Sequence, residues 1–311
     1  MADMVFSGVT FTGGYSISIP PPPPTSYKAI FGYGYTTTVL SMTNLVSNTG
    51  VVATDTTGVG TARYGLAGAG YGTDKAIFGY GITGSATSIT NLVSNTGVVA
   101  TNTTGVGTAR YYLSAATYGT NKAIFGYGVD ANSDNVSMTN LVSDTGVVAT
   151  DTTGVGTARQ SLAAAGYGTD KAIFGYGGAN AGFTAITNKV SNTGVVAIDT
   201  TGVGTARRQV AAAGYGTDKA IFGYGSGPTA VTNLVSNTGV VATNTTGVGT
   251  ARNSLAAATY GTGTAIFGYG FGPSGVTAIT NLVSNTGVVA TDTTGIGTAR
   301  YELAAASYGL T

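Results

Sequence analysis

Three residue types are absent from this 311-residue sequence: cysteine, histidine and tryptophan. Their absence excludes disulfides, Cys/His metal sites and an imidazole general base. No segment approaches the roughly 18 consecutive apolar residues of a membrane-spanning helix, so we expect no membrane insertion. The start of the chain, "MADMVFSGVTFTGG", lacks a basic stretch followed by a long apolar run, and a standard secretory signal is therefore not expected.

Charge is also scarce. Charged residues make up 8% of the chain, and the net charge is +1. A nucleic-acid partner is not expected, because binding to phosphates requires a basic stripe. So little charge is unusual for a free soluble monomer, and it favours a molecule that is held in an assembly.

What the chain has instead is one block written six times. "TNLVSNTGVVATDTTGVGTAR" occupies residues 43–63 and returns with at most two substitutions at 90–110, 139–159, 187–207, 232–252 and 280–300. A second block, "KAIFGYG", travels with it. This block begins at Lys28, Lys75, Lys122, Lys171 and Lys219, and as "TAIFGYG" at Thr264.

Each unit contains four segments of strand length, separated by turns rich in Gly, Asn, Asp and Thr. In residues 65–110 these segments are "GLAGAGY", "KAIFGYG", "SITNLV" and "VVATN". The segments "AIF" and "VVA" are apolar on consecutive residues, so both faces of each sheet should be covered. Such units with this period predict an all-β chain folded as a six-bladed β-propeller of four-stranded blades over residues 28–311.

The phase of the chain ends supports a closed ring. The pattern starts at the second strand of a unit, and residues 301–311 supply the first strand that the beginning lacks. Pairing the C-terminal strand with the first unit would remove a sheet edge. An open solenoid, the alternative, would need distinct polar caps at both ends.

The order "AR", "LAAAGYGTDKAIFGYG", then "TNLVSNTGVVATDTTGVGTAR" resembles the kelch repeat over residues 28–311. In that family an arginine precedes an innermost strand of small residues, and the second strand ends in two glycines. Here "GYG" at 32–34 replaces the two glycines, and valine (Val51 or Val52) stands where the family has tryptophan. The Gly/Thr/Asn/Tyr-rich repeats with a short "VTFTGG" arm also resemble virion accessory proteins of tailed bacteriophages.

One arginine closes each copy of the long block. The kelch resemblance implies that these arginines form an anion-binding ring at the channel mouth. Alternatively they are structural and bond backbone carbonyls between blades, or pair with the aspartates of "DTTG". All six units keep the arginine, but Asn102 and Asn244 replace the aspartate in two of them, so a salt bridge is not the whole reason. The arginines are Arg63, Arg110, Arg159, Arg207, Arg252 and Arg300.

Other repeated residues favour structural roles. The tyrosine of each "FGYG" is expected to wedge between adjacent blades, although a ring of tyrosines could also stack on sugars. The lysine of each "KAIFGYG" is expected to begin a strand after a hairpin turn. Asp130 and Asp134 form either a weak Ca²⁺ site or an ordinary polar loop. The sequence therefore predicts no enzyme, no metal site and no cofactor.

The six units differ mainly in the segment between "FGYG" and "TN". Because strand direction reverses at each turn, these loops should share one face with the blade crossovers, opposite the uniform "YGTDK" and "SNTG" turns. Variable loops on a rigid scaffold are typical of contact surfaces. The two residues after each arginine also vary, on the same side. The loop positions chosen as candidates are Tyr35, Gly84, Asp130, Asp134, Phe183, Pro228, Phe271 and Pro273.

The N-terminal segment 1–19 alternates apolar and polar residues around Gly13, as a β-hairpin does. An isolated hairpin is marginal in water, so this arm is expected to dock on another protein or on copies of itself. Residues 20–27 contain five prolines and predict a stiff linker. A tail without structure is the alternative. The assembly residues would be Val5, Phe6, Val9, Phe11, Tyr15, Ile17 and Ile19.

Together these features predict a non-enzymatic protein on the surface of a phage virion, as a tail fibre, baseplate or capsid decoration. Its arm would bind other virion proteins, and its variable face would bind a glycan or protein of the host surface. The alternative is a kelch-type adaptor that binds an acidic ligand at the arginine ring. A propeller enzyme is the third and least supported hypothesis.

Overall fold

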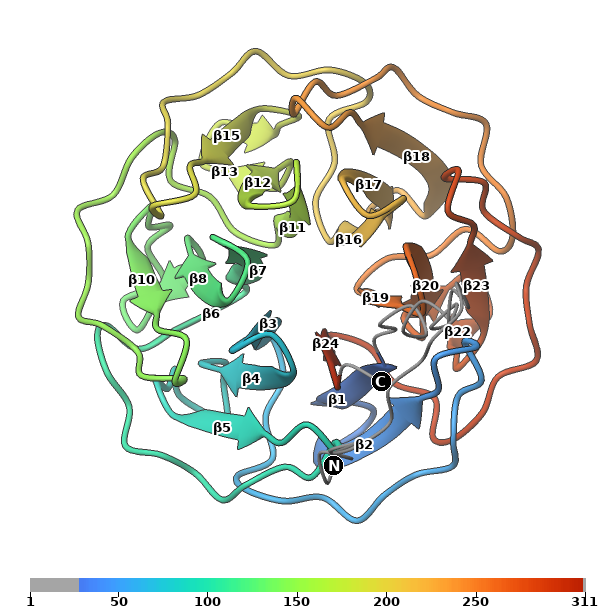
Figure 1. Ribbon diagram of the computed structural model, residues 1–311, viewed down its shortest axis with the longest axis horizontal. Coiled ribbons are helices and arrows are strands. Elements are labelled where there is room, and N and C mark those ends of the chain that lie inside the picture. Colours follow the sequence, from blue (N-terminus) through green and yellow to red (C-terminus); the bar gives the residue numbers. More distant parts are fainter. Residues whose placement is uncertain (1–27, 310–311) are drawn as a thin grey trace, which may run out of the picture.

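The computed structural model describes residues 28–309, which form 24 strands and no helix. The predicted all-β class is confirmed. Six three-stranded antiparallel sheets lie around a common axis, as Figure 1 shows. The arm 1–19 and the linker 20–27 lie outside the described residues.

We number the sheets as blades 1 to 6 and give their strands from the axis outward. Blade 1 is β24 (Ala304–Tyr308), β1 (Lys28–Tyr35) and β2 (Val39–Val46); blade 2 is β3 (Ala67–Tyr71), β4 (Lys75–Gly79) and β5 (Thr90–Val93); blade 3 is β7 (Ser114–Tyr118), β8 (Lys122–Gly126) and β10 (Thr139–Val142); blade 4 is β11 (Ala163–Tyr167), β12 (Lys171–Gly175) and β15 (Thr187–Val190); blade 5 is β16 (Ala211–Tyr215), β17 (Lys219–Gly225) and β18 (Thr229–Val235); blade 6 is β19 (Ala256–Tyr260), β20 (Thr264–Gly268) and β23 (Thr280–Val283).

The C-terminal strand closes the ring. β24 pairs with β1 from Lys28↔Tyr308 to Gly32↔Ala304, so the two ends of the repeat region share blade 1. In Figure 1 the red β24 lies beside the blue β1. The innermost strands β24, β3, β7, β11, β16 and β19 contact one another in that order and back to β24. This closure was expected from the phase of the termini, and it removes the free edge that an open array would expose.

The predicted fourth strand is reduced to two isolated bridges per blade. In blade 1 these are Val46↔Val52 and Thr43↔Thr56. Four residue steps on the outer segment oppose three on β2, so the ladder between the bridges cannot stay in register. The Asn44 side chain enters the gap and donates from Nδ2 to the Ala53 carbonyl at 3.0 Å. The blades are therefore three-stranded, with an irregular outer segment.

The "FGYG" sequence creates a bulge that sends its tyrosine to the next blade. In blade 1 the register shifts between Gly32 and Gly34, and Tyr33 has φ of 63°. Tyr33 is fully buried, packs edge-on against Phe78 of blade 2 at 5.4 Å, and donates its hydroxyl to the Val59 carbonyl. A Cβ on Gly32 would lie 3.0 Å from the Phe78 ring, so a larger residue there would press against that ring. The predicted wedge is confirmed.

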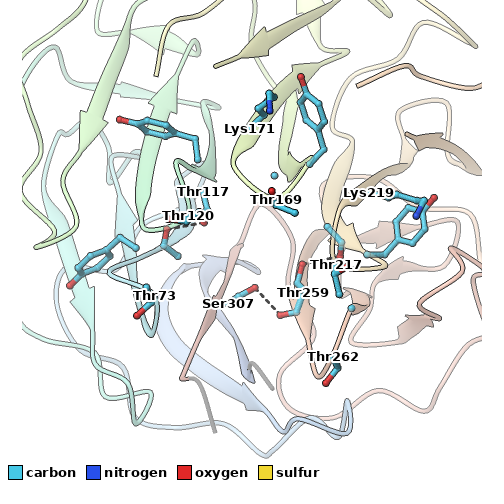
Figure 2. Close-up of a pocket in the computed structure, with 18 of the residues that line it drawn as sticks. Thr73, Thr117, Thr120, Thr169, Lys171, Thr217, Lys219, Thr259, Thr262 and Ser307 are labelled. Carbon is cyan, nitrogen blue, oxygen red and sulfur yellow. Dashed lines mark hydrogen bonds between the residues drawn. The ribbon is translucent and has the colours of Figure 1, made fainter. Parts of the chain in front are cut away.

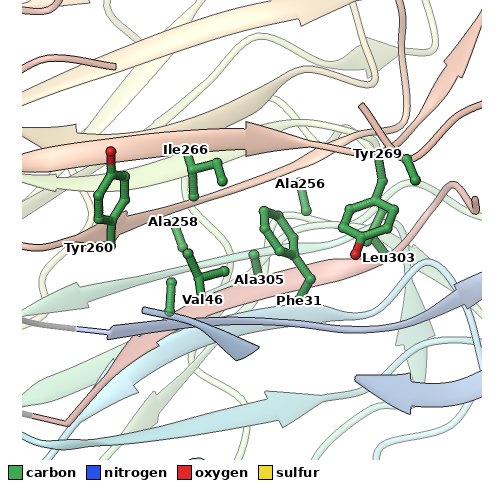
Figure 3. Close-up of a cluster of buried hydrophobic side chains, with 11 residues drawn as sticks. Phe31, Val46, Ala256, Ala258, Tyr260, Ile266, Tyr269, Leu303 and Ala305 are labelled. Carbon is green, nitrogen blue, oxygen red and sulfur yellow. The ribbon is translucent and has the colours of Figure 1, made fainter. Parts of the chain in front are cut away.

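The hydrophobic core lies between neighbouring blades. The alternating side chains of each "AIF" segment enter different clusters. Phe31 joins blade 1 to blade 6, whereas Ile30 joins it to blade 2. Figure 3 shows the first of these clusters, where Phe31 and Val46 face Ile266 and Tyr269. Both faces of each sheet are thus covered, as the consecutive apolar residues predicted. The propeller is held by six similar interfaces rather than by one central core.

Three two-stranded ladders add to the face that carries the variable loops. They are β6 (Arg110–Tyr111) with β9 (Val129–Asp130), β13 (Gly178–Ala179) with β14 (Gly182–Phe183), and β21 (Phe271–Gly272) with β22 (Gly275–Val276). Within residues 28–309 there is no helix of the length and hydrophobicity needed to cross a membrane.

Candidate binding face

The innermost strands separate two mouths of an axial channel. At one mouth the uniform turns surround a cavity of about 370 Å³, lined by residues such as Thr73, Thr120, Thr169 and Lys171. Figure 2 shows threonine side chains from several blades around this opening, with Ser307 donating to the Thr259 carbonyl at 2.8 Å. We call this side the uniform face, because the turns that it carries vary little among the blades.

Most charges of the uniform face are paired locally. Lys75, Lys171 and Lys219 each bond the aspartate before them, at 2.7 to 3.0 Å. Such exposed pairs contribute little to stability. These three lysines begin the second strand of their blades after a tight turn, as predicted from their position, and they give the mouth no concentrated charge.

The opposite mouth is narrowed by a cycle of backbone hydrogen bonds. The second residue after each arginine donates its N–H to the carbonyl of its equivalent in the preceding blade, at 2.7 to 3.2 Å. All six residues have φ between 52° and 61°, and this left-handed conformation directs N–H and C=O to opposite neighbours. A cavity of about 70 Å³ remains on the axis. The members of this axial ring are Gly65, Tyr112, Ser161, Gln209, Ser254 and Glu302.

The predicted arginine ring is buried. All six arginines are at most 1% exposed. Arg159 is typical, because it donates from Nε to the Tyr176 carbonyl (2.8 Å), from Nη1 to the Thr157 carbonyl (3.0 Å) and from Nη2 to Asn188 Oδ1 (2.7 Å). Its guanidinium lies 4.3 Å from the centre of the Tyr127 ring of the preceding blade. Each arginine thus joins two blades.

This geometry corrects the expected anion-binding site. The guanidinium groups of Arg63, Arg110, Arg159, Arg207, Arg252 and Arg300 offer no surface to an acidic ligand, and each of their nitrogens bonds a protein acceptor, except for Arg110 Nε. The physical reason is the bulge at each "GYG". It directs the tyrosine carbonyl of one blade and the tyrosine ring of the preceding blade toward the arginine of "TAR". The six arginines therefore have the structural role given above as the alternative, in which they bond backbone carbonyls between blades.

The repeated Asp/Asn position continues the same network outward. Asp199 accepts from Asn188 Nδ2 (2.9 Å), from the Thr157 amide and from the Thr157 hydroxyl (2.6 Å). Burial alone would raise the pKa of Asp199, but the hydrogen bonds from Thr157 and Asn188 and the charge of Arg159 hold the pKa below its ordinary value. Asn102 preserves the pattern by reversing one bond, since its Nδ2 donates to the Thr61 hydroxyl at 2.6 Å.

The variable segments do lie together, on the side of the axial ring. In five blades the residue after the arginine pairs with the residue after "GYG", as in Tyr301↔Tyr35 and Tyr64↔Ile82. In blade 5 the Arg208 carbonyl accepts from Ser226 N at 2.8 Å. We call this side the variable face. The candidate positions Gly84, Asp134, Phe183, Pro228, Phe271 and Pro273 are exposed there, and Tyr35 and Asp130 are partly exposed.

Asp130 organises its own loop. Its Oδ1 accepts from the amides of Asn132 (2.9 Å) and Asp134 (3.0 Å), which is the pattern of a side chain that replaces backbone in a turn. These bonds between Asp130 and the amides of Asn132 and Asp134 are those of an ordinary polar loop. Among residues 28–309 no group of three or more His, Cys, Asp or Glu side chains is placed to hold a metal ion.

A continuous row of aromatic rings crosses about half of the variable face. Neighbouring ring centres are 4.9 to 6.4 Å apart, from blade 6 through blades 1 and 2 to blade 3. The other half, on blades 4 and 5, carries Gln160, Arg208 and Phe183, with the Arg208 guanidinium 5.1 Å from the Phe183 ring. We call the row the aromatic arc; in order it contains Phe271, Tyr301, Tyr35, Tyr64, Tyr112 and Tyr111.

Glu302 lies beside the arc at the centre of the face. Its Oε1 accepts from the Tyr112 hydroxyl at 3.1 Å across the axial ring. Burial raises the pKa of Glu302, and the hydrogen bond from Tyr112 only partly opposes this. Burial and the nearby charge of Glu302 also raise the pKa of Tyr64. Ser254 lines the same axial cavity, is 7% exposed, and its hydroxyl has no partner within residues 28–309.

Sequence reasoning identified the face but missed most of the arc. It selected Tyr35 and Phe271, and it noted that the two residues after each arginine vary, without selecting Tyr64, Tyr111, Tyr112, Tyr301 or Glu302. The available signal was the pairs "YG", "YY" and "YE" after "AR", which occur in the units around the chain ends. Their proximity depends on ring closure.

Comparisons with known proteins address the fold. The chain is similar to a solved structure described as "Structure of YjhT", a β-propeller-type fold, with a TM-score of 0.61 and 10% sequence identity over 87% of this chain and 99% of that chain. No family model matches the sequence, and no curated protein matches it. The predicted β-propeller is therefore confirmed, and at this identity the likeness concerns the fold alone.

Proposed function

We propose that the protein is a non-enzymatic binding scaffold on a bacteriophage virion, as a tail fibre, baseplate or capsid decoration. Its variable face would contact the host surface or a neighbouring protein, and residues 1–19 would attach it to the particle. A propeller fold supports a binding or structural scaffold. The virion setting is supported by the low charge, the Gly/Thr-rich repeats and the alternating arm.

One observation carries this proposal: the two faces differ in how far the units diverge. On the uniform face the turns differ little from blade to blade, and most of their charges are paired locally. On the variable face the loops differ in length and chemistry, and two exposed phenylalanines, Phe183 and Phe271, are 51% and 42% exposed. A scaffold with no ligand needs neither divergence nor exposed aromatic groups on one side only.

The adaptor hypothesis receives no support from this geometry, because it requires arginines that an acidic ligand can reach. All six guanidinium groups are buried between blades. The variable face is thus the better supported contact surface.

Attachment competition tests the proposal. The full chain, added to host cells before phage particles, is expected to reduce particle attachment. Tyr35→Ala in the variable face should weaken this competition, whereas Thr217→Ala in the uniform mouth should leave it unchanged. Competition that both variants retain equally, or no competition by the unaltered chain, would contradict the proposal. Imaging of labelled particles would show where on the virion the protein lies.

A further inference from the structure

We propose that the aromatic arc and the axial cavity beside it bind a neutral carbohydrate. This inference rests on the proposed attachment function, and it names the ligand class and the residues that would recognise it. Two features of the face are combined: a row of partly exposed rings, and a small axial cavity lined by the residues of the axial ring and by leucine and valine side chains.

The arc provides aromatic faces of the kind on which sugars stack. Tyr35 contacts Tyr64 at 5.2 Å and Tyr301 at 5.6 Å, in tilted and edge-on arrangements. A pyranose has faces of C–H groups, which interact favourably with the electron-rich face of an aromatic ring. Five of the six arc residues are tyrosines, whose hydroxyls can also bond sugar hydroxyls. Rings that already contact one another lose little conformational entropy when a ligand binds.

The axial cavity supplies hydrogen-bonding groups at the end of the arc. Ser254, Gln209 and Glu302 all line it. The Ser254 hydroxyl is more than nine-tenths buried and makes no hydrogen bond within residues 28–309. This hydroxyl oxygen is closed off from the cavity, so Gln209 and Glu302 are the groups that would bond a sugar hydroxyl. At about 70 Å³ the cavity suits a hydroxyl or hydroxymethyl group rather than a large side chain.

Charge and size select among ligand classes. Glu302 is the charged member of the axial ring and lies next to the arc. A carboxylate there repels acidic sugars, phosphates and nucleic acids, and it accepts hydrogen bonds from neutral polyols. A protein partner usually anchors a large aromatic or arginine side chain in a deep pocket, and this cavity is too small for either. A neutral carbohydrate fits both features.

The test measures binding of the full chain to immobilised neutral hexose oligosaccharides and to oligosaccharides that carry carboxylated sugars. We expect binding to a neutral member of the panel. Tyr35→Ala and Tyr64→Ala should each raise Kd by on the order of tenfold, the loss typical of an anchoring aromatic side chain. Tyr64→Phe keeps the ring and should keep most of the affinity. Phe183→Ala, on the other half of the same face, is the matched control and should leave Kd unchanged.

Ser254→Ala is a second control. Because the hydroxyl is buried and has no partner within residues 28–309, its removal should lower neither thermal stability nor affinity. Tighter binding of the acidic panel, or neutral binding that survives both Tyr→Ala changes, would overturn the inference. If no carbohydrate binds but attachment competition persists and is lost in Tyr35→Ala, the ligand is a protein and only the carbohydrate inference fails. If competition is also absent, the proposed function fails with it.

Discussion

Arg159 connects three parts of the propeller through one planar group. Its guanidinium bonds the Tyr176 carbonyl just after β12 and the side chain of Asn188 in β15, and its face lies on Tyr127 of the preceding blade. A guanidinium has five donors in a fixed plane, so it can meet several acceptors while one face stays free for stacking. Lysine carries the same charge without that geometry, which explains why no unit uses it.

We therefore predict that Arg159→Lys lowers the free energy of unfolding by about 2–4 kcal/mol, because buried acceptors on two strands lose their partners. Urea unfolding followed by tyrosine fluorescence would measure this change. Arg208→Lys is the matched control, since Arg208 lies outside this network over Phe183, and it should change stability by less than about 1 kcal/mol. Equal stability of both variants would contradict the structural role.

The Asp/Asn position gives a pH prediction with a defined sign. The pKa of Asp199 is lowered in the folded state, so its contribution to stability is present above the unfolded pKa of about 4 and is lost as pH falls through the folded pKa. Asp199→Asn should retain most stability at neutral pH, because Asn102 and Asn244 occupy the same network in other blades. Its unfolding free energy should fall less on acidification than that of the unaltered chain.

Asn102→Asp is the reverse test of the same position. The new carboxylate would accept from Thr61, as Asp199 accepts from Thr157, and stability should then depend more steeply on acid. The comparison requires urea unfolding at neutral and acidic pH for both variants. Parallel pH curves for all three proteins would show that this position does not couple to folding.

At the scale of strands, the turns and strands that depend on neighbouring residues were predicted from local sequence patterns. The "SNTG" turns close with glycine in the left-handed region, as in Gly50 with φ of 83°, and the segments that contain "KAIFG" and "TNLV" are strands. The fourth strand was predicted and is irregular, because the bond from Asn44 to Ala53 depends on a side chain and not on strand propensity. The axial ring was not predicted. Its residues share a conformation but no residue type, from Gly65 to Glu302, so only their position around the axis defines them.

The ring depends on one strand, β24, which closes it by pairing with β1. Deleting residues 304–311 should abolish most of the stability of the fold, since β24 pairs along β1 and packs against β3 and β19, and β1 would gain an exposed edge that promotes aggregation. Deleting residues 310–311 alone is the control and should have little effect. Thermal unfolding and size-exclusion chromatography would compare the two. A monomeric, stable 304–311 deletion would contradict the closure argument.

For the whole molecule, repetition and divergence have separate roles. The buried arginines, tyrosine wedges and phenylalanines recur because each blade meets equivalent neighbours, while the variable face differs from blade to blade. The aromatic arc depends on both, because Tyr35 and Tyr301 come from opposite ends of the chain and meet only when the ring closes. The sequence alone therefore predicted which face would diverge, but not which of its residues would form one surface.

The N-terminal arm belongs to this largest scale, since its proposed role is attachment rather than folding. We predict that deletion of residues 1–24 leaves the thermal unfolding of the propeller unchanged, because every blade strand lies within residues 28–309. Incorporation into particles, or self-association, should be lost. Replacing Val5, Val9 and Phe11 with serine in the full chain would test the apolar residues without shortening the arm, and serine-to-alanine changes at Ser16 and Ser18 would be the control. Unchanged incorporation after the deletion would show that the propeller itself carries the contact.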